Sequence, residues 1–395
     1  MSVPMIFIPG IKGTKLVETN KVSHDVIFSG LQSNFETIED LELTGPYPFP
    51  EGYRYDRKVD AIIRAGELEG LAYAEFLFDM NDVEHIGPIY IFNYDWRRSC
   101  RENGRLLHEF VEYLIKKSEA IGRNFTEFNF VTHSLGNFVL RNYLMRSGFD
   151  RVHKIVFVAP PFRGSISMAS VVLTGQGWFE SVRRKIRKLI KTFPGALELL
   201  PSYDKASVFD TAPLAHRFFE FDDWQENVRT DDEHDYPERF KRTLEYARDT
   251  VEHHLADLAA LPEAQRERIL VIARHGYETY QSLKVIRTPD EGPANFFDFE
   301  NACKTSDGDS AVPHVSSCCW ADSVLTLMLD DAWLFREYSH AFVLKDERVQ
   351  TLVERFFSDT KPFDYRIPGG SVKKVEGVKA VACGKGLKKW ETVFA

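Results

Sequence analysis

The 395-residue sequence contains no run of 18 apolar residues, and its first ten residues, MSVPMIFIPG, have no basic segment before a short apolar run. These two absences argue against a membrane-spanning helix and against a secretory signal peptide. Basic residues are also too few for a general nucleic-acid binder, because 50 Lys and Arg against 59 Asp and Glu give a net charge of −9. We therefore expect a cytoplasmic protein without a nucleic-acid partner, for which peripheral contact with membranes stays open.

Cysteine is scarce, and its spacing is irregular. The sequence contains Cys100, Cys303, Cys318, Cys319 and Cys383. An odd number of cysteines without a C-x-x-C spacing is typical of reduced thiols and not of a disulfide framework or a zinc site. We expect no metal and no organic cofactor.

Short apolar runs that are typical of strands alternate with stretches of helical periodicity. The strand-like runs are MIFIPG, GPIYIFNYDW, FTEFNFVTHS, HKIVFVAPP and RILVIARHG. Between two of them, Leu106, Phe110, Tyr113 and Leu114 recur at helical spacing. This alternation predicts an α/β fold with a mostly parallel central sheet that is flanked by helices.

One segment interrupts the alternation. Residues 165–262 are helix-rich and strongly charged, and the strand pattern resumes after them. We therefore predict a discontinuous core at 1–164 and 263–360, with a helical lid or cap inserted at 165–262. The Gly- and Lys-rich residues 361–395 are expected to form a tail or small appendage.

Ser134 lies in FVTHSLGNFVL, where a strand-like segment meets a helix-like one. A nucleophilic serine on such a strand-to-helix turn has a strained backbone and needs small neighbours, usually in a G-x-S-x-G pattern. Here Thr132 replaces the first glycine and Gly136 supplies the second. The pentapeptide alone leaves both a catalytic serine and a surface serine open.

Two downstream segments supply partners in the order that α/β-hydrolases use, which is serine, acid, histidine. Asp309 lies in DGDSAVPH, and His340 precedes a helical stripe in VQTLVERFF. Asp307 is the alternative acid, and the spacing to Val-Pro favours Asp309. We predict a Ser134–Asp309–His340 triad, in which His340 removes the serine proton and Asp309 orients the imidazole. His133 is interpreted as a neighbour of the serine and not as the base.

The segment FIPGIKGTKL follows the first strand-like run. Gly10 and Gly13 allow the backbone to approach another segment closely. We predict that the N–H groups of Ile11 and Leu135 form an oxyanion hole. A plain turn at the end of a strand is the alternative interpretation.

These motifs, taken together, resemble the lecithin:cholesterol acyltransferase-like family of α/β-hydrolases, which includes lysosomal phospholipases. The segments that carry the resemblance are IFIPGIKGTKL, NYDWRRSCRENG, VTHSLGN, APPFRGS and DGDSAVP, within about residues 4–165 and 300–357. The resemblance implies the hydrolase fold, the same triad, the Ile11 donor and chemistry on lipid acyl esters. It also implies that residues 94–97 are structural support near the serine. APPFRGS departs from the family, because it lacks the family's Trp and double glycine.

A basic amphipathic helix is predicted within the lid, at 178–193. Its apolar face would carry Trp178, Phe179, Val182, Ile186, Leu189, Ile190 and Phe193, and basic residues fill the rest. We expect Trp178, Phe179 and Ile186 to contact the substrate. Such a helix suits an anionic lipid surface. The alternative is a cap helix that lies on the core with its basic face in solvent.

These patterns predict a serine-dependent hydrolase or acyltransferase that acts on phospholipid or acylglycerol esters through an acyl-serine intermediate. Hydrolysis is favoured over transfer, because water is always present and no acceptor motif is visible. A non-lipid esterase, thioesterase or amidase with the same triad is the alternative, as is a non-catalytic binding protein with this fold. The sequence does not indicate the oligomeric state.

Overall fold

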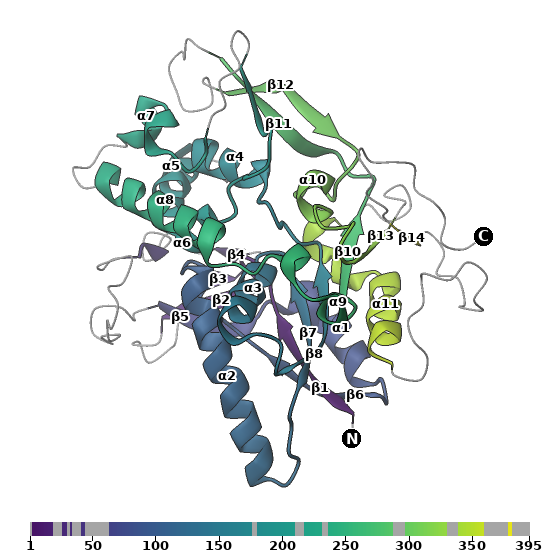
Figure 1. Cartoon of the computed structure of the whole chain (residues 1–395). Coiled ribbons are helices and arrows are strands. Elements are labelled where there is room, and N and C mark those ends of the chain that lie inside the picture. Colours follow the sequence, from purple (N-terminus) through teal and green to yellow (C-terminus); the bar gives the residue numbers. More distant parts are fainter. Residues whose placement is uncertain are drawn as a thin grey trace.

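The computed structural model describes residues 2–18, 26–29, 32–33, 41–43, 63–175, 180–209, 217–230, 236–286, 297–329, 339–358 and 378–380. A seven-stranded sheet in the order β14-β13-β10-β8-β7-β1-β6 forms its centre (Figure 1). Six strands pair in parallel, namely β6 (Ile86–Ile91), β1 (Val3–Ile8), β7 (Phe128–His133), β8 (Val152–Val158), β10 (Ile269–Arg274) and β13 (Leu325–Leu329). The seventh, β14 (Val378–Ala380), is antiparallel to β13, so part of the predicted C-terminal tail extends the sheet.

Helices cover both faces of this sheet. One face carries α1 (Gly70–Asn81) and α11 (Glu347–Phe357), and the other carries α2 (Cys100–Ala120) and α3 (Gly136–Ser147). In β1, Met5 and Phe7 belong to the apolar core under α1 and α11, whereas Ile6 and Ile8 belong to the apolar core under α2 and α3. All four side chains are fully buried. Side chains alternate between the faces of a strand, so a sheet covered on both sides requires consecutive apolar residues. The predicted fold class, an α/β-hydrolase with a mostly parallel sheet, is confirmed.

The segment between β8 and β10 is mainly helical, and most of its helices lie together at the upper left of Figure 1. It contains α4 (Ile166–Thr174), α5 (Glu180–Ile190), α6 (Pro194–Leu197), β9 (Ser207–Phe209), η2 (Phe221–Asp223), α7 (Glu226–Arg229), α8 (Tyr236–His253), η3 (Leu258–Ala260) and α9 (Glu263–Arg266). The boundaries of the lid and of the discontinuous core stay predictions.

A hairpin that the sequence patterns did not predict follows β10. It consists of β11 (Thr279–Val285) and β12 (Phe297–Thr305), and β9 of the lid segment pairs with β11 in parallel. The chain leaves the central sheet at the end of β10, forms the hairpin, and returns to the end of β10. There the Gly276 N–H, just after β10, donates to the Ser306 carbonyl, just after β12, at 2.8 Å. The loop after β12, which contains Asp309, therefore lies next to the carboxyl end of β10. It leads into α10 (His314–Ser317), and η4 (His340–Lys345) follows β13.

A second, four-stranded antiparallel sheet follows the first strand. Its order is β4-β3-β2-β5, from β2 (Thr14–Glu18), β3 (Val26–Ser29), β4 (Gln32–Ser33) and β5 (Ile63–Leu68).

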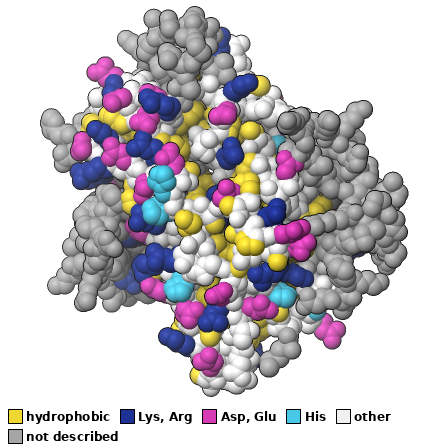
Figure 2. Space-filling model, viewed as in Figure 1, with side chains coloured by type: hydrophobic (Ala, Val, Ile, Leu, Met, Phe, Trp, Pro, Cys, Tyr) yellow, Lys and Arg dark blue, Asp and Glu magenta, His cyan; other side chains and the backbone are white. Residues whose placement is uncertain are grey.

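On the face that Figure 2 shows, acidic and basic side chains lie interspersed and not in separate areas. Among the described residues, no helix combines the length and the apolar character that crossing a bilayer would need.

Candidate active site

Ser134 occupies the turn between β7 and α3. Its φ of 50° lies in the left-handed region, which non-glycine residues rarely adopt. The turn is held because the Ser134 N–H donates to the Val158 carbonyl at 3.1 Å. Such strain persists where the surroundings over-determine the backbone, and in α/β-hydrolases it presents the nucleophile at the top of the sheet. Thr132 lies within β7, fully buried and paired with Ile8 and Phe157 of the neighbouring strands.

Two glycines allow the first loop to touch this turn. A Cβ atom at Gly10 would lie 2.8 Å from the Ser134 Cβ and 3.0 Å from the His133 Nδ1. A Cβ atom at Gly136 would lie 2.5 Å from the Ile8 carbonyl oxygen. The separations of 2.8 and 2.5 Å are shorter than a Cβ atom tolerates, so the loop after β1 and the start of α3 can approach this closely only if both positions are glycine.

In the predicted triad, His340 lies within hydrogen-bond distance of both Ser134 and Asp309. His340 Nε2 is 2.8 Å from Ser134 Oγ, and His340 Nδ1 is 2.7 Å from Asp309 Oδ2. The His340 N–H also donates to the Asp309 carbonyl at 3.0 Å, which ties η4 to the acid loop. This is the geometry that a serine–histidine–acid hydrolase requires of its nucleophile, base and orienting acid.

The environment of Asp309 favours its ionised form. Burial to 2% exposure by itself opposes ionisation. The adjacent His340 and the backbone N–H groups of Val312 and Ala311, which donate to Oδ1 at 2.7 and 3.0 Å, outweigh it and lower the pKa of Asp309. Asp307, the alternative acid, instead contacts His275, with 3.3 Å between Oδ1 and Nδ1. Of the two aspartates, only Asp309 contacts His340 in the described structure.

His133 and Tyr73 form a buried network that the sequence patterns did not predict. The Gly10 N–H donates to Tyr73 Oη at 3.2 Å, and Tyr73 Oη lies 2.9 Å from His133 Nδ1. His133 Nε2 donates to the carbonyl of His340 at 2.9 Å. Burial, followed by the nearby His340, lowers the pKa of His133 to about 3, so the ring is neutral near pH 7. The network links the first loop, the serine turn and the backbone of His340.

The two predicted oxyanion donors belong to the loop after β1 and to the start of α3, the two segments that meet at the serine turn. Ile11 is in a turn closed by the Gly13 N–H and the Gly10 carbonyl at 3.0 Å, and Lys12 follows it with a φ of 62°. That closing bond does not use the Ile11 N–H. Leu135 is fully buried at the N-terminus of α3, where backbone N–H groups have no partner within the helix. The role of the two N–H groups as an oxyanion hole stays a prediction.

Residues 94–97 contact the backbone around the first loop. Tyr94 Oη donates to the Pro9 carbonyl at 2.8 Å, and Trp96 Nε1 donates to the Thr14 carbonyl at 3.0 Å. The buried guanidinium of Arg97 forms a bidentate pair with Asp95, at 3.0 Å from Nε and 2.8 Å from Nη2. Fork-shaped pairs of this kind fix orientation, so the segment holds the loop in place, and Trp96 also lines the cavity above Ser134.

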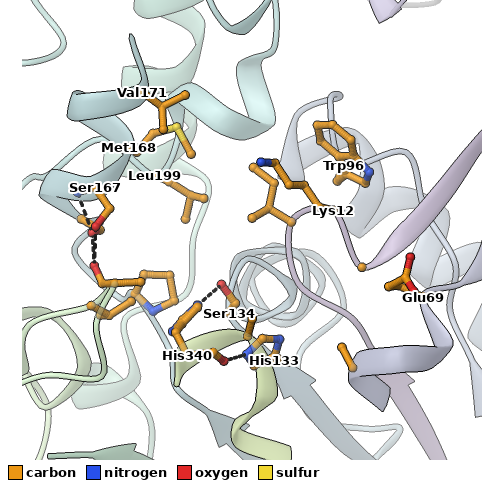
Figure 3. A pocket seen from close by; sticks show the side chains of 18 of the residues that line it. Lys12, Glu69, Trp96, His133, Ser134, Ser167, Met168, Val171, Leu199 and His340 are labelled. Atoms are coloured by element: carbon orange, nitrogen blue, oxygen red, sulfur yellow. Dashed lines mark hydrogen bonds between the residues drawn. The ribbon is translucent and has the colours of Figure 1, made fainter. Parts of the chain in front are cut away.

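A cavity of about 380 Å³ opens above Ser134. In Figure 3, Ser134 and His340 lie at one end of the cavity, Met168, Val171 and Leu199 lie at the other, and the Lys12 side chain reaches in from the side of Trp96. Burial lowers the pKa of Lys12. The lid segment supplies much of the apolar lining, namely Met168, Val171, Ile186, Leu189, Ile190, Phe193 and Leu199.

The lid helix ends at Ile190, three residues before the predicted end at 193. Helix α5 spans Glu180–Ile190, and Ile186, one of the three residues expected to contact substrate, lines the cavity. The other two, Trp178 and Phe179, lie outside the described residues. Lys191, predicted on the basic face, is buried to 2% exposure and donates to the Val228 carbonyl. Its amine also lies 5.6 Å from the centre of the Phe240 ring, because α7 and α8 pack over the end of α5.

Comparisons with known proteins agree with this architecture. The family model for lecithin:cholesterol acyltransferase matches residues 87–226, which include the serine turn. One chain of the solved Tle4–Tli4 complex is similar over 90% of this chain and 97% of that chain, with a TM-score of 0.61 and 13% identity. At that identity, the likeness supports the fold alone.

A weaker likeness exists to the lipase BlEst2 of Bacillus licheniformis in its mature form. It covers 90% of this chain and 92% of that chain at 10% identity, and its TM-score of 0.37 is too low to support a conclusion. The comparison with curated proteins gives no match. The family match supports an acyl-ester hydrolase or acyltransferase in general terms. The chain thus has the α/β-hydrolase fold, and its residues 87–226 are similar to the lecithin:cholesterol acyltransferase family.

Proposed function

We propose that this chain cleaves lipid acyl esters with Ser134 as the nucleophile, and that water resolves the acyl-serine. The observation that carries the proposal is the Ser134 hydroxyl, 2.8 Å from His340 Nε2, at one end of a mainly apolar cavity. Nucleophile, base and orienting acid supply the chemistry, and the lining suits a hydrocarbon chain.

The reaction would begin with transfer of the Ser134 proton to His340 Nε2 while Oγ attacks the ester carbonyl. Asp309, held ionised by its hydrogen bonds, stabilises the imidazolium and keeps Nδ1 protonated. The N–H groups of Ile11 and Leu135 would bind the tetrahedral oxyanion. His340 then returns the proton to the leaving alcohol, and the same steps with water release the fatty acid.

The substrate class follows from the cavity. Each methylene moved from water into an apolar site contributes about 0.8 kcal/mol, which is roughly a fourfold change in an equilibrium constant. We expect kcat/KM for p-nitrophenyl esters to rise by about this factor per methylene until the acyl chain outgrows the cavity of about 380 Å³. The polar groups of a polar substrate would find few hydrogen-bond partners in this apolar lining.

We further propose that the basic side of α5 contacts anionic lipid headgroups. Arg183 and Arg184 are exposed there, whereas Ile186, Leu189 and Ile190 face the cavity on the other side. The charge is partly compensated, because Arg183 and Arg187 both lie within 3.2 Å of Glu180 carboxylate oxygens. Association with anionic vesicles should weaken as salt screens the charges.

The central test is Ser134→Ala, assayed on p-nitrophenyl butyrate and by fluorophosphonate labelling. We expect turnover to fall by about 10⁴-fold or more, with loss of labelling and an unchanged circular dichroism spectrum. Ser147→Ala is the matched control, because Ser147 Oγ lies 3.0 Å from His108 Nδ1 outside the cavity. Labelling that persists in Ser134→Ala would exclude this nucleophile.

The substrate and the acceptor are tested separately. Wild-type protein is incubated with mixed phospholipid and acylglycerol vesicles plus an added alcohol, and the products are identified by mass spectrometry. Free fatty acid as the main product supports hydrolysis, whereas acyl ester of the alcohol indicates transfer. Labelling of Ser134 without lipid turnover would contradict the lipid substrate and leave a non-lipid ester, thioester or amide.

A further inference from the structure

Three potential metal ligands lie beside the acid loop. His275, Asp307 and His314 each offer one ligand atom, and these atoms all lie within 4.8 Å of one another. Two of them are closer, because His275 Nδ1 is 3.3 Å from Asp307 Oδ1. The two imidazole rings lie 5.6 Å apart at an angle of 38°. The residues have no motif spacing in the sequence, where no metal was expected, and only the fold brings them together.

Backbone hydrogen bonds hold the three positions. The His275 N–H donates to the Leu329 carbonyl of β13 at 2.9 Å, which fixes the residue after β10. The His314 N–H donates to the Asp307 carbonyl at 2.9 Å, so two of the three residues are joined directly. A site whose ligands are preorganised loses little conformational entropy when an ion binds.

The hydrogen bonding of His314 sets its tautomer. Its Nε2 lies 3.1 Å from the carbonyl oxygen of Arg274, and a carbonyl oxygen only accepts, so Nε2 carries the proton. Nδ1 therefore has the lone pair that coordination needs. Histidines that bind metals commonly donate their second N–H to a backbone carbonyl in this way.

We propose that His275, Asp307 and His314 bind a divalent transition-metal ion of the zinc type, with water as the fourth ligand. Nitrogen and carboxylate ligands bind zinc at about 2.0–2.2 Å in a tetrahedron, so their mutual separation is about 3.4 Å. The 3.3 Å pair already has this separation. The side chains of His275 and Asp307 are 26% and 44% exposed, which gives them room to close on the ion and admits water.

The position of the site gives the ion a structural role. Asp307 lies two residues before Asp309, and the Gly308 carbonyl accepts from the Tyr277 N–H at 3.2 Å. An ion that joins Asp307 to His275 would brace the acid loop against the end of β10. The proposal does not depend on the proposed function, because metal binding is measured without a substrate.

The test uses full-length protein that has been treated with a chelator and then titrated with Zn²⁺ by calorimetry. We expect one ion per chain and a thermal midpoint that rises with Zn²⁺ concentration. Asp307→Asn and His275→Gln should each bind at least tenfold more weakly, with unfolding midpoints in the absence of metal within a few degrees of wild type.

The matched control is Asp249→Asn. Asp249 and His254 form an aspartate–histidine pair at 3.1 Å, with 46% and 30% side-chain exposure, and they belong to no cluster of three potential metal ligands among the described residues. This variant should bind Zn²⁺ like wild type. Equal affinity in wild type and Asp307→Asn, or equal losses in Asp249→Asn and Asp307→Asn, would overturn the site.

Cobalt distinguishes this site from the cysteines. Co²⁺ bound by nitrogen and oxygen ligands in a tetrahedron should give visible absorption that Asp307→Asn abolishes. An intense near-ultraviolet thiolate charge-transfer band in its place would assign the ion to cysteine and refute the proposal, since Cys303 is exposed.

Discussion

The contact between Gly10 and the serine turn gives the sharpest test of the catalytic geometry. In Gly10→Ala the new Cβ would lie 2.8 Å from the Ser134 Cβ, whereas ordinary contacts begin at about 3.4 Å. The loop or the serine must therefore move by about 0.6 Å. A displacement of about 1 Å at a reacting group costs on the order of 10²-fold in rate, and loss of one oxyanion donor costs about 10²–10³-fold. We expect kcat on p-nitrophenyl butyrate to fall by about 10²-fold with a smaller change in KM.

Stability must be separated from catalysis in this experiment. Overpacking typically costs about 1–3 kcal/mol, so urea unfolding is measured alongside the kinetics at a temperature where the variant is folded. Gly70→Ala is the control, because its Cβ would meet only the Ala74 Cβ, at 3.9 Å, near the exposed start of α1. Wild-type kcat in folded Gly10→Ala would refute the assignment of the first loop to the oxyanion site.

Two further predictions concern charged groups. Lys12→Met should lower kcat/KM for phospholipid by about tenfold while a neutral diacylglycerol changes little, because a hydrogen bond to a charged group contributes about 1.5–3 kcal/mol; equal losses on both lipids would exclude a headgroup contact. Glu198 is fully buried, and burial raises its pKa from 4.5 to about 7 although Ser99 and Cys100 donate to it. The folded state therefore binds more protons than the unfolded state between these values, so this group should remove up to about 3 kcal/mol of stability as pH rises through the window. Unfolding midpoints at pH 5 and 8 should differ less in Glu198→Gln than in wild type.

The sequence predicted what depends on order along the chain. Alternating apolar runs indicated the parallel sheet, and the order of Ser134, Asp309 and His340 selected three residues that the fold brings into contact. It could not predict Tyr73. In the sequence this residue is an aromatic position of a helix, and its importance comes only from the proximity of Gly10 and His133 in space.

Two other features differ from the sequence-based prediction, namely the unpredicted strand β11 and the buried side chain of Lys191. Leu283, Lys284 and Val285 at the end of β11 alternate between buried and less buried side chains, but Gln281 in the same phase is exposed, so a period of two could have identified only the end of this strand. Lys191 had no such signal. Helical periodicity placed it on the basic face, and it is buried because α7 and α8, which follow later in the sequence, pack over it and Val228 supplies a carbonyl acceptor.

Asp307 and Asp309 show why residue spacing alone cannot assign a catalytic acid. Both flank Gly308 in the same short loop, and either could be drawn beside His340 from the sequence. Asp309 is buried and accepts two backbone N–H groups, so its charge is stabilised where water is excluded. Asp307 is 44% exposed and faces His275, an arrangement suited to an ion and not to an imidazolium formed during turnover. The loop can serve two sites because burial separates the two carboxylates, and Asp309→Asn should therefore abolish turnover but leave Zn²⁺ affinity unchanged.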